Sequence, residues 1–486
     1  QFTKIPEAMK WAVENGADYP LRFPNVDNYT GENKDAYDEK WMHVGDVREW
    51  EKMGYPVKTY RTIRAKDLWN LINICATYSA EPGIFFIDNA NEMTNAVGYK
   101  QKVVCTNPCG EQPLAPYSVC NLAAINLANM VDRDKAEVDW VKLERTIRVA
   151  IRMQDNVIDK THYFLDENKN QALGERRIGL GIMGLHDLLI WCNKRYGSNE
   201  ANVLVEELFK FISTNAYEES IEIAKVKGSF PFLETEENVE LFLQSGFIKK
   251  LPEYIRESIR KNGIRNSHLL TIAPTGSTGT MVGVSTGLEP YFAFTYYRSG
   301  RLGKFIEVNA PIVDKYLEKY PQYTKETLPD TFVSAMELAP EEHVDVQCVI
   351  QNWVDSSISK TVNAPKGYSV EEVEQVYMRL YKGGAKGGTV YVDGSRDSQV
   401  LTLSKDETEK ISSPKQVDIA ELGVEIEEEK KEPKEQKTQG LRNDRQDRNI
   451  GIEAGDICPI CLEGTVENIG GCHTCTNCNA QLKCGL

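Results

Sequence analysis

The sequence predicts an α/β fold in which short parallel strands alternate with long helices. Fully apolar runs bounded by turn residues, IFFI at 84–87 and TVYV at 389–392, are typical of buried strands. Longer segments between them carry apolar residues at helical spacing, above all 138–158 and 203–226. Buried strands that alternate with helices of this length are characteristic of α/β architectures with parallel strands.

The other elements follow in chain order from the same patterns. Residues 1–60 are polar and rich in aromatic side chains, and their weak periodicity predicts loops and a short helix. Residues 67–78 repeat apolar side chains at helical spacing ahead of a Pro-Gly pair, so we expect a helix there. The run LLTI at 269–272 lies just before Pro274 and predicts one more buried strand.

Composition excludes several classes of protein. The chain has 486 residues, of which 41% are hydrophobic, and a net charge of −15. It contains no apolar run long enough to span a membrane and opens with no signal-peptide pattern, so we expect a soluble, cytoplasmic protein without a membrane partner. The acidic balance argues against nucleic acid as a partner, because phosphate binding needs a basic face.

The distribution of charge and cysteine predicts three regions. Residues 404–457 are dominated by Glu, Lys, Gln and Asp and have almost nothing apolar to bury, which indicates a flexible linker. Six of the 12 cysteines lie beyond this linker, in residues 458–486. We therefore expect a globular body over 1–403, the linker, and a small Cys-rich module over 458–486.

The terminal module has the spacing of a zinc ribbon. Two CxxC pairs can close four thiolates around one Zn²⁺, and a module of this size needs such a staple to fold. The four candidate ligands are Cys458, Cys461, Cys475 and Cys478. Two further cysteines, Cys472 and Cys484, exceed what one zinc ion needs. They are either spare or alternative ligands, or a dithiol on a mobile arm that exchanges disulfides at a buried site.

The segment TNPCGE, residues 106–111, carries a candidate catalytic set. Asn107, Cys109 and Glu111 alternate along a Pro/Gly loop, and in an extended loop they would share one face. A thiol, a carboxylate that takes a proton and an amide that holds a hydroxyl suit chemistry on a small substrate. The alternative is that Cys109 is a small buried hydrophobic residue, as free cysteines commonly are.

Five segments resemble the ribonucleotide reductase family, in the family's order. TNPCGEQPLAPYSVCNLAAINLANMV is similar to the active-site finger loop of the large chain, and the others are residues 176–189, 273–293, 353–365 and 387–401. The terminal CPIC and GCHTCTNC resemble the ribbon of adenosylcobalamin-dependent, class II members. The resemblance covers about residue 60 to the end. It implies the C-terminal part of a ten-stranded α/β barrel with a central finger loop, followed by a small zinc ribbon.

The resemblance also implies a role for each residue of the loop. Cys109 would carry the thiyl radical, generated by adenosylcobalamin, that abstracts the ribose 3′-hydrogen. Glu111 would take the proton of the 3′-hydroxyl, with Asn107 hydrogen-bonded to the sugar. Cys120 would be one of the two thiols that supply the electrons and end as a disulfide.

Two glycine-rich segments need separate interpretations. After the strand at 269–272, backbone N–H groups and hydroxyls offer an anion cradle at a helix start, and the resemblance implies that this loop binds the substrate phosphates. Its residues are Pro274, Thr275, Gly276, Ser277 and Thr278. Residues 179–184 fit GxGxxG, but no buried strand precedes them, so we interpret these glycines as close packing and not as a dinucleotide site.

The implied function is reduction of ribonucleotides, with diphosphates as expected substrates and thioredoxin or a similar reductant as electron donor. The alternatives are a class I large chain that needs a separate metal-containing radical subunit, and a zinc-ribbon binding protein. The earlier half of the family's barrel, with its second redox cysteine, has no counterpart in this sequence. We therefore expect the missing N-terminal half as a partner and no activity from this chain alone; whether it forms a homodimer is left open.

Overall fold

The computed structural model describes residues 2–4, 6–300, 303–395, 401–402, 455, 457–458, 464–469, 472–477 and 481–484. Apart from residues 455 and 457, the linker expected at 404–457 lies outside this part. The chain divides into two compact units, one of residues 1–295 and 309–398 and the other of residues 296–308 and 399–486. Within the described residues, we find no helix of the length and apolar character that a membrane span requires.

In the first unit, short bridging segments join two of the sheets. One sheet has the order β1-β4-β14-β13, and the other is the parallel pair β7–β10. Their bounds are Phe2–Lys4 for β1, Gly83–Phe85 for β4, Gly387–Val392 for β14, Thr361–Ala364 for β13, Asn121–Asn126 for β7 and Ile178–Met183 for β10. Leu270 bridges to Leu180 of β10, and Ile272 bridges to Ile358 just before β13, both in parallel.

The strand directions follow from these pairings. The strands follow one another in the order β7, β10, residues 270–272, β13 and β14, and each pairs in parallel with the next. Strand β14 then pairs antiparallel with β4. The α/β class is thus confirmed, with one antiparallel junction added to the parallel strands. Within the described residues β7 and β1 each pair on one side only, so closure into a barrel stays a prediction.

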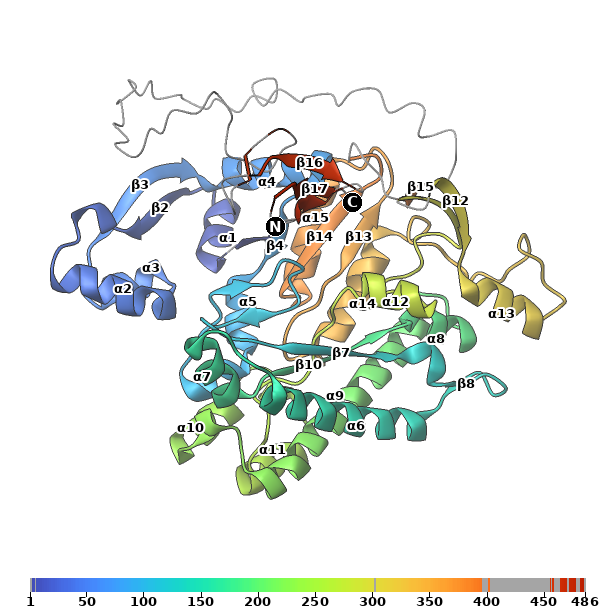
Figure 1. The fold of residues 1–486 in the computed structure, drawn as a ribbon, viewed down its shortest axis with the longest axis horizontal. Coiled ribbons are helices and arrows are strands. Elements are labelled where there is room, and N and C mark those ends of the chain that lie inside the picture. Colours follow the sequence, from blue (N-terminus) through green and yellow to red (C-terminus); the bar gives the residue numbers. More distant parts are fainter. Residues whose placement is uncertain are drawn as a thin grey trace. The chain divides into compact units, whose positions relative to one another are not determined.

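Long helices cover these strands, and Figure 1 shows α6 and α9 together below the β7–β10 pair. The largest apolar core lies among β7, β10, α6 and α9, and a second one among α4, α15, β13 and β14. The bounds of these helices are Trp140–Lys160 for α6, Asn199–Lys227 for α9, Ala65–Ser79 for α4 and Val370–Lys382 for α15. The helices expected at 67–78, 138–158 and 203–226 are therefore confirmed as α4, α6 and α9.

The strand predictions were confirmed less completely. Residues 389–392 belong to β14, but the strand expected at 84–87 ends at Phe85, and Ile87 already begins α5 (Ile87–Met93). Residues 269–272 pair as isolated bridges. The remaining elements of this unit are α1 (Glu7–Glu14), η1 (Val26–Asn28), η2 (Asn95–Tyr99), β5 (Cys105–Thr106), β6 (Pro113–Leu114), η3 (Leu127–Asn129), β8 (Val131–Asp132), β9 (Glu137–Val138), α7 (Asp166–Glu175), α8 (Leu185–Trp191), η4 (Pro231–Leu233), α10 (Glu236–Leu243), η5 (Ile248–Lys250), α11 (Glu253–Asn262), α12 (Gly276–Val282), α13 (Pro311–Lys319) and α14 (Pro340–Gln351).

The prediction of loops and a short helix over residues 1–60 was wrong. Strand β2 (Asp18–Pro24) pairs antiparallel with β3 (Val57–Arg64), and helices α2 (Glu32–Val44) and α3 (Val47–Lys52) lie between them in sequence. Trp50 is completely buried in a small core of this lobe. Most side chains of β3 are exposed, so the alternation that marks a half-buried strand is missing from its sequence.

The described part of the second unit contains two small sheets. Strands β11 (Thr295–Gly300), β12 (Gly303–Asn309) and β15 (Leu401–Thr402) form one of them in the order β12-β11-β15. Strands β16 (Val466–Ile469), β17 (Cys472–Cys475) and β18 (Gln481–Cys484) form an antiparallel sheet in the Cys-rich module. Its register places Cys472 opposite Cys484.

Candidate active site

The TNPCGE segment forms the tip of a β-hairpin. Strands β5 and β6 pair antiparallel, and beyond them the Asn107 N–H donates to the Gln112 carbonyl at 3.2 Å. The Gln112 N–H donates to Asn107 Oδ1 at 3.0 Å, and the Gly110 N–H donates to the Asn107 carbonyl at 3.1 Å. Gly110 has a φ of +82°. The segment is therefore a tight turn and not the extended loop we expected, because Pro108 and Gly110 favour turn conformations.

Within this turn, Cys109 is exposed and Glu111 is buried. The Glu111 residue is only 2% exposed, and its Oε2 has no hydrogen-bond partner in the described structure. Partial burial and the charge of Glu111 raise the pKa of the Cys109 thiol. At neutral pH the turn thus presents a protonated S–H near a carboxylate with a free oxygen. An orphaned buried carboxylate oxygen is costly, which points to a ligand that supplies its partner.

The main chain of Glu111 is fixed to the bridging segments of the sheet. Its carbonyl accepts a hydrogen bond from Thr271 Oγ1 at 2.7 Å and another from the Ser357 N–H at 2.9 Å. Ile272 and Ile358 form one of the parallel bridges. Thr271 and Ser357 are the residues that directly precede them in the chain. The hairpin tip is therefore held over the middle of the parallel strands.

Cys120 lies beside the same anchor. A Cβ on Gly179 would be 2.9 Å from Cys120 Sγ, 2.7 Å from Thr271 Cγ2 and 2.9 Å from Leu122 Cδ2. One on Gly181 would be 2.4 Å from the Thr271 carbonyl oxygen. Both glycines lie inside buried strand β10. This confirms close packing at Gly179 and Gly181, two of the three glycines of the GxGxxG segment, and it brings Cys120, Thr271 and the Glu111 main chain together.

Two buried charged residues that the sequence did not single out, Glu175 and Arg177, act on Cys120. Arg177 Nε lies 3.5 Å from Glu175 Oε2, and Glu175 also accepts from the Tyr99 hydroxyl at 2.8 Å and from Ser118. Burial raises the pKa of the Cys120 thiol, Arg177 opposes this shift, and the charges of Glu175, Asp355 and Glu111 add to it. The only signal in the sequence was the charged run ERR directly before the glycine-rich strand.

The predicted phosphate loop begins three residues after Thr271. Helix α12 starts at Gly276, and the preceding Thr275 has a φ of +48°. Thr275 Oγ1 accepts from the Gly287 N–H at 2.7 Å, and no side chain caps the helix. Residues 276–278 are exposed. Their N–H groups therefore face solvent at a helix start, within about 18 Å of chain from Thr271.

The described part of the Cys-rich module holds two of the four expected zinc ligands. Cys458 and Cys475 are both buried, and the Asn477 N–H donates to Cys475 Sγ at 3.3 Å. Cys461 and Cys478 lie outside the described residues. Among those that are described, no group of three or more metal-ligating side chains converges. Two buried sulfurs, one of which accepts a backbone N–H, fit thiolate ligands, and the zinc site stays a prediction.

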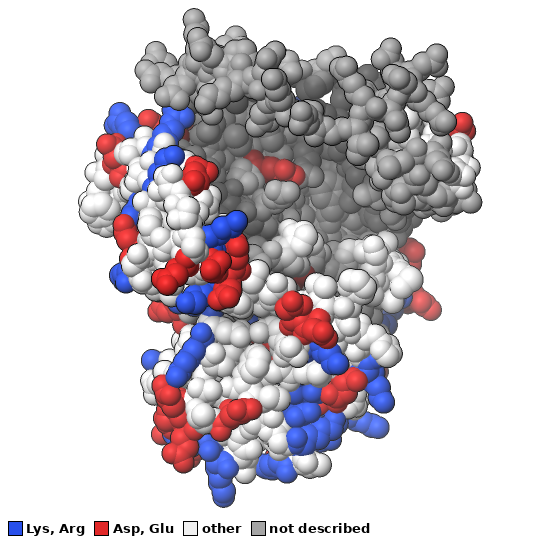
Figure 2. Space-filling view, turned by 60° about the vertical axis from the view of Figure 1, so that its left-hand side comes forward, with Lys and Arg blue, Asp and Glu red and all other residues white. Residues whose placement is uncertain are grey.

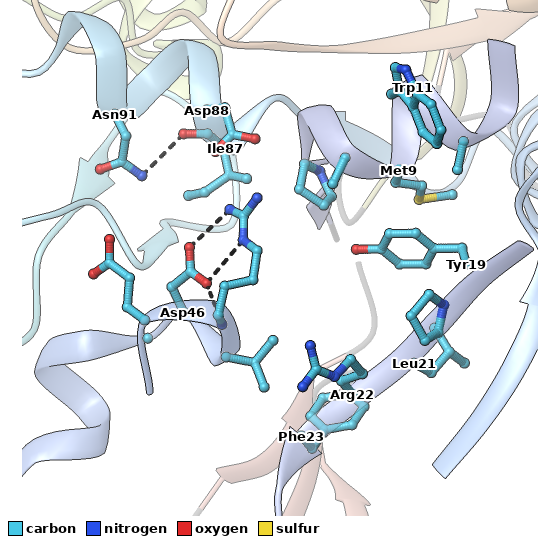
Figure 3. A pocket seen from close by; sticks show the side chains of 18 of the residues that line it. Met9, Trp11, Tyr19, Leu21, Arg22, Phe23, Asp46, Ile87, Asp88 and Asn91 are labelled. Atoms are coloured by element: carbon cyan, nitrogen blue, oxygen red, sulfur yellow. Dashed lines mark hydrogen bonds and ion pairs between the residues drawn. The ribbon is translucent and has the colours of Figure 1, made fainter. Parts of the chain in front are cut away.

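A separate cavity of about 910 Å³ lies between the N-terminal lobe and the body of the first unit. Figure 3 shows Met9 and Tyr19 on one side of it and Asp46 and Ile87 on the other. Asp46 pairs with Arg48 at 3.0 Å, and further ion pairs join Arg22 to Glu51 and Lys102 to Glu49. None of the predicted site residues lines this cavity. On the face drawn in Figure 2, basic and acidic side chains are interspersed.

Comparison with known proteins assigns the family. Residues 3–391 match the family described as ribonucleotide reductase, barrel domain. Because this match covers most of the chain, the chain belongs to the ribonucleotide reductase family, which confirms the family that the five sequence segments indicate.

Three curated relatives show how similar the chain is to individual members of this family. The vitamin B12-dependent ribonucleoside-diphosphate reductase of Mycobacterium tuberculosis is 34% identical over 359 residues, which are 70% of this chain and 48% of that protein. The protein of the same name from Thermoplasma acidophilum is 33% identical over 383 residues, 75% of this chain and 47% of that protein. The ribonucleoside-diphosphate reductase subunit alpha of Chlamydia muridarum is 26% identical over 488 residues, 91% of this chain and 43% of that protein. The chain thus spans about half the length of the curated relatives it matches.

Proposed function

We propose that this chain is the C-terminal part of the catalytic chain of an adenosylcobalamin-dependent ribonucleotide reductase. Its reaction is the reduction of ribonucleoside diphosphates to 2′-deoxyribonucleotides for DNA synthesis. The observation that carries the proposal is the hairpin tip, where an exposed Cys109 thiol stands near a buried Glu111 carboxylate with an unpartnered oxygen. The names of the Mycobacterium and Thermoplasma relatives support B12 as the cofactor and diphosphates as the substrates.

The residues of the turn suit this chemistry. Adenosylcobalamin, when bound, would supply a carbon-centred radical that can accept a hydrogen atom. The raised pKa of Cys109 keeps its thiol protonated, so a hydrogen atom is present on the sulfur to be removed. The thiyl radical then takes the 3′-hydrogen of the ribose, and Glu111 Oε2 accepts the proton of the 3′-hydroxyl. Asn107 Oδ1 already accepts from Gln112, so its Nδ2 is the group that holds the sugar hydroxyl.

Reduction requires two electrons and the departure of the 2′-hydroxyl as water. We assign one of the two thiols to Cys120 and the other to the N-terminal half of the enzyme, which this chain does not span. The two thiols end as a disulfide, and the hydrogen atom returns from Cys109 to C3′. The substrate phosphates are assigned to the exposed start of α12, residues 274–278.

The C-terminal module completes the electron path. We assign zinc to Cys458, Cys461, Cys475 and Cys478. The facing register of Cys472 and Cys484 supports their assignment as the dithiol that passes electrons from thioredoxin or a similar reductant. We assign the charged segment 404–457 as the linker of this arm.

A second candidate is a class I large chain, which a separate radical-generating subunit would activate. The similarity to the Chlamydia subunit alpha, over 91% of this chain, favours it. The two candidates differ in what starts the reaction, a bound cobalamin or a second protein.

The test is CDP reduction by this chain combined with its missing N-terminal half, with dithiothreitol as reductant and without a second metal subunit. Product only when adenosylcobalamin is present supports the proposal, and Cys109→Ser then abolishes the product. Product that appears without adenosylcobalamin, and only after a metal-containing subunit is added, supports the class I candidate. Product with neither the cofactor nor the subunit overturns both. No product under any of these conditions, with the fold intact, overturns both.

A further inference from the structure

Arg177 and Cys120 stand side by side at the start of two neighbouring parallel strands. In the register of β7 and β10, Ile178 pairs with Asn121, so Arg177 and Cys120 each lie one residue before this pair. Adjacent strands are about 4.8 Å apart. The Cys120 sulfur lies toward β10, since it would be 2.9 Å from a Cβ placed on Gly179.

The Arg177 side chain is completely buried and is held from several directions. Its Nη1 donates to the carbonyl of Pro113, in strand β6 of the active-site hairpin, at 3.3 Å. Its Nη2 lies 3.4 Å from His268 Nε2, and burial together with Arg177 lowers the pKa of that histidine, which is therefore neutral. Arg177 Nε makes no hydrogen bond among the described atoms but forms an ion pair with Glu175 Oε2 at 3.5 Å. The guanidinium is thus a fixed charge between the hairpin and the strand that follows Cys120.

We propose that Arg177 is a positioning residue for the redox thiol, whose guanidinium stabilises the Cys120 thiolate when the Cys120 disulfide is reopened, and that Glu175 limits this stabilisation. The inference rests on the proposed function for the redox role of Cys120. It goes beyond that function by assigning electrostatic control of this thiol to a pair of neighbouring residues.

The step is a thiol–disulfide exchange. A thiolate of the dithiol reductant attacks the sulfur that is bonded to Cys120, forms a mixed disulfide with it, and releases Cys120 as a thiolate. The second thiol of the reductant then closes the reductant's own disulfide and releases the other enzyme thiol, while Cys120 takes a proton. A thiolate of lower basicity leaves faster, so a cation beside Cys120 accelerates this opening.

Besides burial, the main influences on the pKa of the Cys120 thiol are four charged groups. Arg177 lowers its pKa, whereas Glu175, Asp355 and Glu111 raise it along with burial. Arg177 is the one cation among these four groups. Arg177 lowers the pKa of Cys120 and Glu175 raises it. Removing each charge in turn should therefore change the reactivity of Cys120 in opposite directions, whereas structural damage would not.

The experiment measures the alkylation rate of Cys120 by iodoacetamide between about pH 7 and 10, read on the Cys120 peptide by mass spectrometry of the full chain. A one-unit change in pKa alters the thiolate fraction tenfold. We expect Arg177→Gln to slow the reaction about tenfold at pH 8, Arg177→Lys to slow it less, and Glu175→Gln to accelerate it several-fold. Buried Cys192 serves as an internal control for unfolding.

Arg176→Gln is the matched control. Arg176 is as buried as its neighbour, but it pairs with Asp155 and Asp159, both at 2.8 Å, so the Cys120 rate is expected to change less than twofold. The inference is overturned if Arg177→Gln leaves the rate unchanged, or if Arg176→Gln slows it equally. If Cys192 becomes reactive in Arg177→Gln, this variant is unfolded and Glu175→Gln is the deciding variant. Any result other than faster alkylation of Cys120 in Glu175→Gln then overturns the inference. Alkylation requires no turnover, so these outcomes are independent of the Cys109→Ser assay.

Discussion

Gly179 occupies the point where strand β10 meets the anchored hairpin, and its replacement by alanine tests the whole arrangement. The added Cβ would lie 2.7 Å from Thr271 Cγ2 and 2.9 Å from both Cys120 Sγ and Leu122 Cδ2. Carbon atoms need about 3.5–4.0 Å, so each neighbour must move by about 1 Å. Leu122 is half exposed and can turn away. Thr271 cannot move without stretching its hydrogen bond to the Glu111 carbonyl.

The expected loss of stability follows from these contacts. Overpacking of a core site costs about 1–3 kcal/mol, and loss of one hydrogen bond adds about 1 kcal/mol. We therefore expect Gly179→Ala to lower the free energy of unfolding by about 2–4 kcal/mol, measured by urea denaturation followed by tryptophan fluorescence. Thr271→Ser, which removes Cγ2 and keeps the hydroxyl, should recover part of this loss when combined with Gly179→Ala.

The control is Gly276→Ala, because a Cβ there meets nothing within 4 Å. We expect its free energy of unfolding to stay within about 1 kcal/mol of the parent chain, with any change being a gain. A Gly179→Ala variant as stable as Gly276→Ala would refute the close packing of Cys120 and Thr271 against β10.

Three further predictions concern charge and metal. Glu111→Gln removes the charge that helps to raise the pKa of Cys109, so alkylation of Cys109 at pH 8 should accelerate several-fold. An unchanged rate would show that the charge of Glu111 does not act on the Cys109 thiol. Burial lowers the pKa of Lys386 to about 7. Above this pH the unfolded chain binds a proton that the folded chain lacks. The free energy of unfolding, relative to that of Lys386→Met, should therefore rise between about pH 7 and 10, by at most about 1.4 kcal/mol per pH unit. A flat difference across this range contradicts the shift. The chain should bind one Zn²⁺, measured by atomic absorption, and Cys458→Ser combined with Cys475→Ser should abolish binding; retained zinc would exclude these ligands.

The sequence predicted elements with a strong period and missed those whose stability comes from their neighbours. Helix α6 places its buried residues three and four positions apart over its whole length, and α9 is long with many buried apolar residues, so the apolar pattern was sufficient to predict both helices. The β2–β3 hairpin exposes most of β3 and has no such spacing. The bridges at Leu270 and Ile272 were readable as an apolar run, but their partners depend on tertiary contacts.

The same division applies to the candidate site. Cys109 and Glu111 were found because a thiol and a carboxylate on a Pro/Gly turn are chemically informative in one short segment. Thr271, Glu175 and Arg177 were missed because each acts on the hairpin or on Cys120 across more than 50 residues of sequence. Their common signal is indirect: each lies within or beside a segment that resembles the ribonucleotide reductase family, and their roles required the fold.

The unpaired edge of β7 bears on two predictions at once, the closure of the barrel and the position of the second redox thiol. Within the described residues β7 pairs only with β10, and Cys120 stands at its start. If a strand from the part of the enzyme that this chain does not span paired antiparallel with this edge, facing Cα atoms would be about 4.5–5.5 Å apart. A disulfide requires a Cα separation of about 4.4–6.8 Å. We therefore predict that the strand that pairs with β7 carries the second redox thiol, so that one pairing would both extend the sheet and complete the thiol pair.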